Sequence, residues 1–438
     1  MASQLPENAG VSGWVAMLPP RVERPRLEGK LTCDVVVIGG GFAGLSAARR
    51  LSELDPKLRV CVLEAGVVGE GAAGRNSGFV IDLPHEVSSE DFSASANKWR
   101  QDITIHRRAI ALAAEMAAEE GWGADIFDPC GRYSVAMSDE GDKHLVTYAR
   151  QLSELGEAHS PLDAKQTAEI TGCHAFTSGL FMPGTVMIQP AAYIRAVADC
   201  LKERVQIFER TPALSLESVD GGWLVKTPHG SVAARKIILA NNGHAQSFGF
   251  FRGRLLHVFT YASLTTEFDP ARLEGLRKWG ATPALPMGTT VRRINGRSGD
   301  RILIRSRYTY NPSLEIGDGS MRRAAAQHLR KFAARFPALQ DIEMEYRWAG
   351  AMAITWNSVP AFGEVEPGII AACGCNGLGA TKATASGIAA AEAALGVSSE
   401  LGRIYHSFQP PKSLPPQPLT TIGAKLTLAV REWNAGAE

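Results

Sequence analysis

Residues 33–44 read Cys-Asp-Val-Val-Val-Ile-Gly-Gly-Gly-Phe-Ala-Gly, and this stretch decides the fold. A short run of β-branched residues that ends in glycine predicts a buried parallel strand over 33–39. Residues 45–54 follow with apolar side chains on one side of a predicted helix. A second short strand over 59–63 ends in Glu64. Together the strand, the G-x-G-x-x-G turn, the helix, the second strand and its terminal acid predict a βαβ unit that binds a dinucleotide.

The glycines of this turn each have a physical function. Gly39 permits the tight turn, Gly41 lets a pyrophosphate approach the backbone, and Gly44 lets the helix pack closely against the strand. The helix N-terminus presents free N–H groups and a positive dipole end to the phosphates. Glu64 can accept hydrogen bonds from the hydroxyls of an unphosphorylated adenosine ribose, which argues against NADP but leaves FAD and NAD both open.

The composition excludes several other classes of protein. The 438-residue chain is 45% hydrophobic and 21% charged, as is typical of a globular protein with two or three packed units. Its 46 basic and 45 acidic residues nearly balance, which argues against a nucleic-acid surface. No run of 18 apolar residues occurs, so no membrane span is predicted. The N-terminal residues lack a signal-peptide pattern, and we expect a cytoplasmic protein.

The seven cysteines are scattered along the chain, which favours reduced thiols over a disulfide framework. Cys373 and Cys375 are the pair closest together, and a single Cys-x-Cys is weak support for a metal site. We therefore predict no metal.

The segment that follows Glu64 separates FAD from NAD. Residues 65–78 read Ala-Gly-Val-Val-Gly-Glu-Gly-Ala-Ala-Gly-Arg-Asn-Ser-Gly. This segment resembles the glycine-rich stretch after the second strand in the D-amino-acid oxidase-like family of flavoproteins, which includes glycine oxidase and sarcosine oxidase. Residues 71–78 look most like the γ-glutamylputrescine oxidase branch. In the family the stretch passes beside the FAD pyrophosphate and the flavin ring, where small residues let the backbone approach closely.

Three later segments support the resemblance. Residues 211–213, Thr-Pro-Ala, precede a predicted hairpin over 214–227, and the family has a similar segment whose backbone touches the adenine. Residues 236–243 resemble the family's strand that closes over the nucleotide. Residues 368–381 read as a strand and a glycine-rich turn before a helix over 383–395, and they resemble the C-terminal flavin site. There a helix N-terminus stabilises negative charge on the reduced flavin.

The resemblance therefore implies a set of residues that line FAD. They are Gly39, Gly41, Phe42, Ala43, Gly44, Glu64, Ala65, Gly71, Ala72, Arg75, Asn76, Ser77, Gly78, Pro212, Ala213, Ala240, Asn241, Gly374, Asn376, Gly377, Leu378, Gly379, Ala380 and Thr381. Some relatives attach the flavin covalently through a cysteine in the region that corresponds to Ala351 and Met352. Because no cysteine is present there, we expect non-covalent FAD.

The resemblance also implies the architecture, an α/β fold. A Rossmann-like FAD-binding domain of the glutathione-reductase type would be joined to an α+β substrate domain built on an antiparallel sheet. In the second domain we expect strands over 256–266 and 301–307 and a helix over 320–336. The predicted boundaries are 27–95, 185–250 and 346–400 for a discontinuous FAD domain, 96–184 and 251–345 for the substrate domain, and 401–438 for a proline-rich linker and a tail helix.

The implied chemistry is oxidation of the C–N bond of a small amine or amino acid. A hydride passes from the carbon beside nitrogen to flavin N5, and water hydrolyses the resulting imine. The protein supplies orientation and electrostatics, so we assign no catalytic side chain. The electron acceptor is O2 or a redox partner. Members that activate oxygen often carry a lysine near N5, where this chain has Leu303 or a neighbour, so both an oxidase and a dehydrogenase stay open.

Four side chains are candidates for substrate binding. Arg305 and Arg307 have period 2 and would share one face of a strand, either to bind an anionic substrate group or to lie in solvent. Tyr261 shares a face of the neighbouring strand with His257 and matches a tyrosine of related sequences, although core packing is the commoner role. Lys382 could meet the substrate or flavin O2, or lie on a helix surface.

Several alternatives stay open at this point. Asp82, His85 and Glu86 could line a substrate entry or form an ordinary polar loop. The chain could be an NAD-dependent dehydrogenase, or a flavin-binding subunit without turnover of its own, for which the tail helix is the support. N-alkyl amino acids, γ-glutamyl amines and opine-like secondary amines all fit as substrates. The sequence does not predict an oligomeric state.

Overall fold

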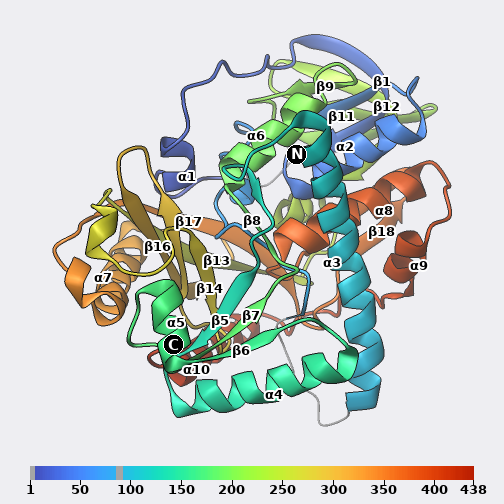
Figure 1. The fold of residues 1–438 in the computed structure, drawn as a ribbon. Helices are drawn as coiled ribbons and strands as arrows, with labels where there is room; N and C mark the ends of the chain where they lie inside the picture. The colour runs from blue at the N-terminus through green and yellow to red at the C-terminus, as the bar shows by residue number, and fades with distance from the viewer. Residues whose placement is uncertain (1–4, 85–91) are drawn as a thin grey trace.

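The computed structural model describes residues 5–84 and 92–438, and its strands form two large sheets and one small sheet (Figure 1). In the first sheet, β1 (Gly29–Ile38) pairs in parallel with both β12 (Gly230–Leu239) and β2 (Val60–Leu63). The sheet continues in parallel from β2 to β9 (Val205–Phe208) and from β12 to β19 (Ile369–Cys373). These strands bury near-continuous runs of valine and isoleucine, as expected of a parallel sheet covered on both faces.

Antiparallel strands extend this sheet on the β12 side. They are β10 (Ser215–Val219), β11 (Gly222–Lys226) and β18 (Ala361–Glu366). The first two form the hairpin predicted over 214–227. The predicted parallel FAD-binding sheet is therefore confirmed, and the carboxyl ends of β1 and β2 lie side by side at one edge.

Two helices pack tightly on one face of this sheet. They are α2 (Phe42–Leu54), which begins at the glycine-rich turn, and α8 (Thr384–Ala394), which follows β19. They approach so closely that a Cβ built on Gly387 would lie 2.1 Å from the carbonyl oxygen of Ala43. The glycine thus permits a helix contact that brings the C-terminal and N-terminal motifs together.

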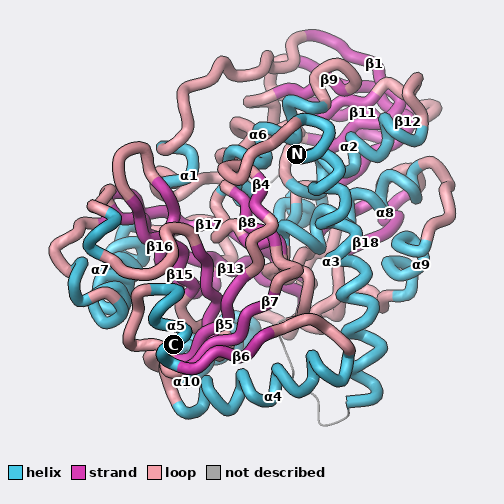
Figure 2. Tube along the Cα trace, in the orientation of Figure 1, coloured by secondary structure: helices cyan, strands magenta, loops and turns pink. Residues whose placement is uncertain are grey.

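The second large sheet is mostly antiparallel, with the strand order β17-β13-β16-β15-β14-β5-β7-β6. Its strands are β5 (Arg132–Ala136), β6 (Ser160–Asp163), β7 (Ser178–Met182), β13 (Leu255–Thr265), β14 (Trp279–Pro283), β15 (Thr290–Asn295), β16 (Asp300–Tyr310) and β17 (Met344–Thr355). The strands predicted over 256–266 and 301–307 are β13 and β16. Figure 2 shows this sheet as a layer separate from the parallel one.

One boundary prediction needs correction. The predicted FAD-domain range 346–400 includes most of β17, but this strand pairs with β13 along its length, from Leu255 opposite Thr355 to Thr265 opposite Met344. It therefore belongs to the second sheet. The remaining domain boundaries stay predictions.

A small third sheet connects the two large ones. It consists of β3 (Phe79–Val80), β8 (Val186–Ile188) and β4 (Phe127–Asp128). Besides α2 and α8, the longer helices are α3 (Phe92–Glu120), α4 (Asp139–Leu155), α5 (Ala164–Thr171), α6 (Pro190–Cys200), α7 (Asp318–Arg335), α9 (Glu400–Ser407) and α10 (Leu419–Ala435). The short ones are α1 (Gly13–Ala16), η1 (Ala72–Gly74), η2 (Asn242–Phe248), η3 (Pro270–Arg272), η4 (Pro337–Leu339) and η5 (Gly379–Ala383).

Helix α7 covers one face of the second sheet. His328 of α7 lies 2.8 Å from the Ser263 hydroxyl of β13, measured from Nδ1, and Ala324 packs with Phe259 and Tyr261. This helix corresponds to the one predicted over 320–336. The opposite face of the sheet therefore remains for contacts with the first unit.

The predicted tail helix is α10, and it docks on its own chain. Glu432 of α10 forms an ion pair with Arg307 of β16 and accepts a hydrogen bond from Gln327 of α7. Within the preceding proline-rich segment, the Leu414 N–H donates to the Gly253 carbonyl oxygen at 2.7 Å. The linker is therefore held against the protein along with the helix.

The buried His328 predicts acid sensitivity. Burial lowers the pKa of His328 to about 4, below the ordinary value of 6.5. The folded protein thus favours neutral His328. The contribution of this residue to the free energy of unfolding is fully present above pH 6.5 and is lost as the pH falls towards 4. We expect this residue alone to cost about 2 kcal/mol at pH 5 relative to neutral pH. In chemical unfolding at the two pH values, His328→Asn should show a smaller acid-induced loss, and an unchanged loss would contradict the assignment.

Candidate functional site

The glycine-rich turn has the geometry that a pyrophosphate requires. Gly39 adopts a φ of +110°, and a Cβ built on Gly44 would lie 1.8 Å from the Gly39 carbonyl oxygen. The N-cap of α2 is Gly41, which offers no side-chain cap to the free N–H groups of the first turn. These donors and the positive end of the helix dipole are therefore available to an anion.

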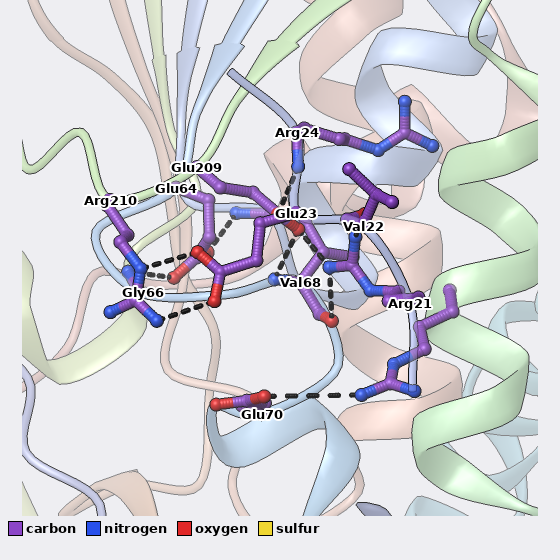
Figure 3. A network of polar contacts seen from close by, with 12 residues as sticks. Arg21, Val22, Glu23, Arg24, Glu64, Gly66, Val68, Glu70, Glu209 and Arg210 are labelled. Atoms are coloured by element: carbon purple, nitrogen blue, oxygen red, sulfur yellow. Dashed lines mark hydrogen bonds and ion pairs between the residues drawn. The ribbon is translucent and has the colours of Figure 1, made fainter. Parts of the chain in front are cut away.

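Glu64 lies beside this turn at the end of β2. Its carboxylate accepts a hydrogen bond from Gly40 N–H at 2.7 Å. It accepts a second from Gly66 N–H at 2.8 Å (Figure 3). Burial raises the pKa of this carboxyl group. A carboxylate has about four acceptor positions, so capacity remains for two ribose hydroxyls after both backbone bonds are made. The residue fits the predicted adenosine contact.

A second glutamate braces the same loop, and sequence reasoning missed it. Glu209 is fully buried just after β9 and forms an ion pair with Arg21. It also accepts hydrogen bonds from the backbone N–H groups of Arg24 at 2.7 Å and Val68 at 2.9 Å (Figure 3). The N-terminal segment is thereby fixed across the loop that follows Glu64. The sequence signal that could have identified Glu209 is its position directly after a buried strand.

The structure brings the other predicted nucleotide segments to the same edge. Thr211 N–H donates to the Glu64 carbonyl oxygen at 2.8 Å, so Pro212 and Ala213 follow directly beside Glu64. Ala240 N–H donates to the Ile38 carbonyl oxygen at 2.9 Å, so the end of β12, with Asn241, adjoins the end of β1.

The segment 71–78 is folded by its own polar side chains. The Arg75 guanidinium donates to four backbone carbonyl oxygens, those of Ala9, Gly10, Glu70 and Ala349, at 2.8 to 3.1 Å. Burial lowers the pKa of Arg75 to about 10. Asn76 donates to the Ala73 carbonyl oxygen. Both side chains are hydrogen-bonded to protein carbonyl groups. Arg75 and Asn76 could therefore contact a flavin through their backbone atoms, and this contact stays a prediction.

A buried cation supports this segment from the second sheet. Arg292 of β15 donates to the carbonyl oxygens of Ser77 at 2.8 Å, Gly78 at 3.2 Å and Ile188 at 2.8 Å. Burial lowers its pKa to about 10. Gly78 adopts a φ of +79°, and a Cβ there would lie 2.0 Å from Arg292 Nη1. Sequence reasoning missed this residue. It places positive charge directly under the loop expected beside the flavin.

The C-terminal motif lies opposite that loop. Asn376 has a φ of +51°, and its side-chain N–H donates to the carbonyl oxygens of Val359 and Gly374 at 2.9 Å. Gly374 N–H in turn donates to the Asn242 side chain. The following turn, η5, has the N-cap Leu378, which provides no side-chain cap. Free N–H groups there suit the negative charge of a reduced flavin.

These features together fit FAD. The described residues bring five predicted segments around two uncapped helical N-termini, one beside Glu64 and one beside Asn376. The first suits a pyrophosphate and an adenosine ribose, and the second suits the flavin ring.

The second sheet turns one face towards this site. A Cβ built on Gly350 of β17 would lie 3.4 Å from the Arg75 Cβ, and one on Gly377 would lie 3.5 Å from the Met352 sulfur. Gly350 pairs with Thr260 of β13, and Met352 pairs with Val258. Residues paired on neighbouring strands point to the same side of a sheet. We call the side of the sheet that carries Gly350, Met352, Thr260 and Val258 the inner face.

Arg305 and Arg307 do not share a face, which corrects the sequence prediction. Arg305 pairs with Ala262 and stacks 4.9 Å from the ring of Tyr308, which pairs with Thr260, so both belong to the inner face. The register of β16 shifts between Ser306 and Tyr308, and Arg307 occupies the bulge with a φ of +63°. Its guanidinium lies 3.7 Å from Glu432 of α10, on the outer side. The extra residue breaks the period of two.

Tyr261 also lies away from the inner face. Its side chain is buried among α7 residues, and its hydroxyl lies 2.7 Å from the Thr309 hydroxyl. His257, on the same face of β13 as predicted, contacts Gln246 at 3.1 Å. The structure therefore gives Tyr261 the core-packing position, and its contact with substrate stays an untested prediction.

Lys382 is engaged in an ion pair. Its ammonium group lies 3.0 Å from the Asp102 carboxylate of α3, and the Tyr405 hydroxyl donates to its carbonyl oxygen. His106, one turn further along α3, is buried, and burial lowers its pKa to about 4, with Lys382 contributing in the same direction. Lys382 thus fixes α3 to η5, and its predicted contact with substrate stays a prediction.

We expect Lys382→Met to lower stability by about 1–3 kcal/mol, because it leaves the largely buried Asp102 carboxylate without its cation. The rate of flavin reduction by substrate should change little. Thermal unfolding and stopped-flow reduction check both expectations, with Asp102→Asn and the double variant completing a cycle. Unchanged stability together with a strongly raised KM would instead indicate that Lys382 binds the substrate.

Another buried arginine lies on the inner face. Arg132 of β5 is completely buried, donates to the Thr282 hydroxyl at 2.7 Å, and has no protein partner for Nε and Nη2 among the described residues. Asp82 is buried and accepts a hydrogen bond from Thr185 at 3.0 Å. The other two residues suggested for a substrate entry, His85 and Glu86, lie outside the described residues.

The described part of the chain contains neither a metal-binding cluster nor a membrane-crossing helix. No group of three or more His, Cys, Asp or Glu side chains there could hold a metal ion. No helix there is both long and apolar enough to cross a bilayer.

Comparisons with known proteins agree with this site. The profile of the family described as FAD dependent oxidoreductase, or DAO, matches residues 34–393. The probable oxidoreductase OrdL of Rhizobium meliloti strain 1021 is 26% identical over 417 residues, which cover 92% of each chain. The gamma-glutamylputrescine oxidoreductase of Escherichia coli K12 is 25% identical and covers 81% of this chain and 82% of its own. The crystal structure of glycine oxidase from Geobacillus kaustophilus superposes with a TM-score of 0.69 at 19% identity, covering 84% of this chain and 96% of that one.

Proposed function

The chain belongs to the FAD dependent oxidoreductase family, and from this premise we propose that it oxidises the C–N bond of a small amine or N-substituted amino acid. Its cofactor is FAD, and members of the family act on CH–NH or CH–NH2 bonds. The NAD-dependent alternative is therefore set aside. The substrate class and the role of each residue belong to the same proposal.

The observation that carries the substrate proposal is Arg305 on the inner face. Its guanidinium stacks on Tyr308 and forms no ion pair among the described residues, whereas Arg307 pairs with Glu432. A guanidinium placed over an aromatic ring and left without a carboxylate partner can bind a substrate carboxylate through two hydrogen bonds. We therefore favour substrates that carry an amine and an anionic group, such as N-alkyl amino acids. The gamma-glutamylputrescine oxidoreductase relative keeps γ-glutamyl amines in the same set.

The side chains of this protein would orient and stabilise rather than exchange protons. Bound FAD supplies the hydride acceptor for the substrate carbon. The turn Gly39–Gly44 and Glu64 hold the nucleotide half, and Asn376 shapes the turn that faces the ring. Arg292 supplies fixed positive charge under the 77–78 backbone, which favours negative charge on the ring. We keep the proposal that the attachment is non-covalent, because Ala351 and Met352 offer no thiol.

The electron acceptor is part of the same proposal. Strands β13 to β17 contain no lysine, which is the residue that oxygen-activating relatives often carry near N5. We favour a dehydrogenase that reduces a redox partner, with an oxidase as the second candidate.

Anaerobic reduction of the flavin tests the proposal. The purified yellow protein would be mixed with a panel of N-alkyl amino acids, γ-glutamyl amines and opine-like secondary amines, together with matched hydroxy acids. We expect loss of the flavin's visible absorption with at least one amine and with none of the hydroxy acids. Reduction by a hydroxy acid alone would contradict C–N oxidation. A chain that no amine reduces, but that gains activity with a second protein, would support a flavin-binding subunit instead.

Admission of air then separates the two acceptors. Rapid reoxidation with release of peroxide would identify an oxidase. A reduced flavin that persists in air but reoxidises with an artificial electron acceptor would identify a dehydrogenase.

A further inference from the structure

The outward face of α10 is a continuous apolar stripe. Its members are between 48% and 85% exposed, although each is a large hydrophobic residue: Leu419, Ile422, Leu426, Val430 and Trp433. They recur every three or four residues, so they lie on one side of the helix. Exposed apolar side chains are ordinary when scattered, but a contiguous set marks an interaction surface. We call these five residues the α10 stripe.

The helix is held so that the stripe must face outwards. Its opposite side carries Glu432, which contacts both Arg307 and Gln327. Just beyond the helix, the Glu438 side chain accepts hydrogen bonds from the Ser138 hydroxyl at 2.7 Å and from Met137 N–H at 2.9 Å. These contacts fix the C-terminal end of the segment, and the Leu414 N–H bond to Gly253 holds the chain before the helix. The helix cannot roll to bury the stripe without breaking these contacts.

The stripe is symmetric about Leu426. Ile422 and Val430 lie four residues to either side, and Leu419 and Trp433 lie seven residues to either side. Two copies of such a helix, related by a two-fold axis next to Leu426, would place Ile422 against Val430 and Leu419 against Trp433. This is the self-complementarity that a two-fold interface requires.

The small residues fit the same arrangement, and the exposed charges make it weaker. Gly423 and Ala429 each lie three residues from Leu426 and are exposed, so they allow close approach of two backbones. Lys425 and Arg431 are exposed, while the acid Glu432 is turned inwards, so two copies bring only like charges together and this repulsion weakens the pairing. Antiparallel helices also bring the positive end of each dipole to the negative end of the other.

From this geometry we infer that α10 packs antiparallel against α10 of a second copy of this chain, around a two-fold axis at Leu426. The inference goes beyond the proposed function and does not depend on the substrate. A helix of 17 residues is about 25 Å long, so its stripe buries less than the roughly 800 Å² per partner of a standard interface. The dimer should therefore be reversible and depend on protein concentration.

Disulfide trapping tests both the pairing and its direction in the full-length FAD-loaded protein. Leu426→Cys should form a covalent dimer under mild oxidation. Ile422→Cys and Val430→Cys should each stay monomeric alone and form the covalent heterodimer when mixed. Because the chain has an exposed Cys130, the unmodified protein is the control under the same oxidant. Trapping of Ile422→Cys with itself, or no trapping by the mixture, would overturn the antiparallel arrangement.

Sedimentation over a range of concentrations gives a second readout. The unmodified protein should pass from monomer to dimer, and Leu426→Lys should remain monomeric, because it adds two cations at the axis beside Lys425 of each copy. Val146→Lys, which alters an exposed valine on α4, is the matched control and should still dimerise. Flavin content should be unchanged in all three. A monomer at every concentration that instead binds anionic vesicles through the α10 stripe would overturn the inference in favour of a lipid surface.

Discussion

Gly41→Val should give a folded protein that has lost its flavin. Gly41 has φ −97° and ψ −162°, which valine adopts readily, and a Cβ there would meet the Ala73 Cβ at 3.4 Å. The fold therefore tolerates the side chain, whereas a pyrophosphate that must approach this backbone does not. We expect FAD binding to weaken by about 3 kcal/mol or more, roughly a hundredfold. Flavin content after purification and titration of the apoprotein with FAD would measure the loss.

Two controls separate loss of cofactor from loss of fold. Gly317→Val introduces the same side chain at a glycine with φ −79° and no described heavy atom within 4 Å of its Cβ position, and it should keep its flavin. Circular dichroism and thermal unfolding of Gly41→Val should match those of flavin-free parent protein. A yellow Gly41→Val protein with normal affinity would show that the pyrophosphate does not lie over this turn.

Arg305→Met should raise the KM for a carboxylate-bearing amine by about 10- to 100-fold. Each hydrogen bond from a charged donor contributes about 1.5–3 kcal/mol, and the methionine preserves the apolar stem while removing the charge. Because the guanidinium binds the substrate in ground state and transition state alike, kcat should change less than KM. Steady-state kinetics with the best substrate and with its decarboxylated analogue would check this, since the analogue should show little change.

Arg307→Met is the matched control two residues along the same strand. It removes a long ion pair with Glu432, 3.7 Å between the charged atoms and only about a quarter exposed, and should cost about 1 kcal/mol of stability, with KM unchanged. Equal effects of the two substitutions on KM would contradict the assignment of Arg305 to the inner face.

The local motifs were predictable from sequence because each is specified by neighbouring residues. The strand, turn and helix at 33–54 depend on β-branched runs and glycines in one short stretch, and they form β1 and α2 as expected. The hairpin over 214–227 and the helix over 320–336 carried similar local signals. The order of the motifs then gave the two-sheet architecture through family resemblance.

The substrate side was less predictable because it depends on single insertions and distant partners. One bulge residue at Arg307 reverses the face that period two assigns to it. Lys382 pairs with Asp102, which is 280 positions earlier in the chain, so no local pattern reveals the pair. Arg292 donates hydrogen bonds to the backbone carbonyl groups of Ser77 and Ile188, which are far away in the sequence. Its position in an ordinary strand gives no indication of these bonds.

The N-terminal segment has a practical consequence for anyone who trims this protein. A chain cut to residues 34–393, the span that the family profile matches, would lose contacts of Arg75, Asn76 and Glu209. Arg75 would lose the Ala9 and Gly10 carbonyls, Asn76 would lose the Trp14 indole N–H on its carbonyl oxygen, and Glu209 would lose Arg21. An expression boundary drawn at the recognised motif would therefore remove the strap that holds the cofactor loops in place.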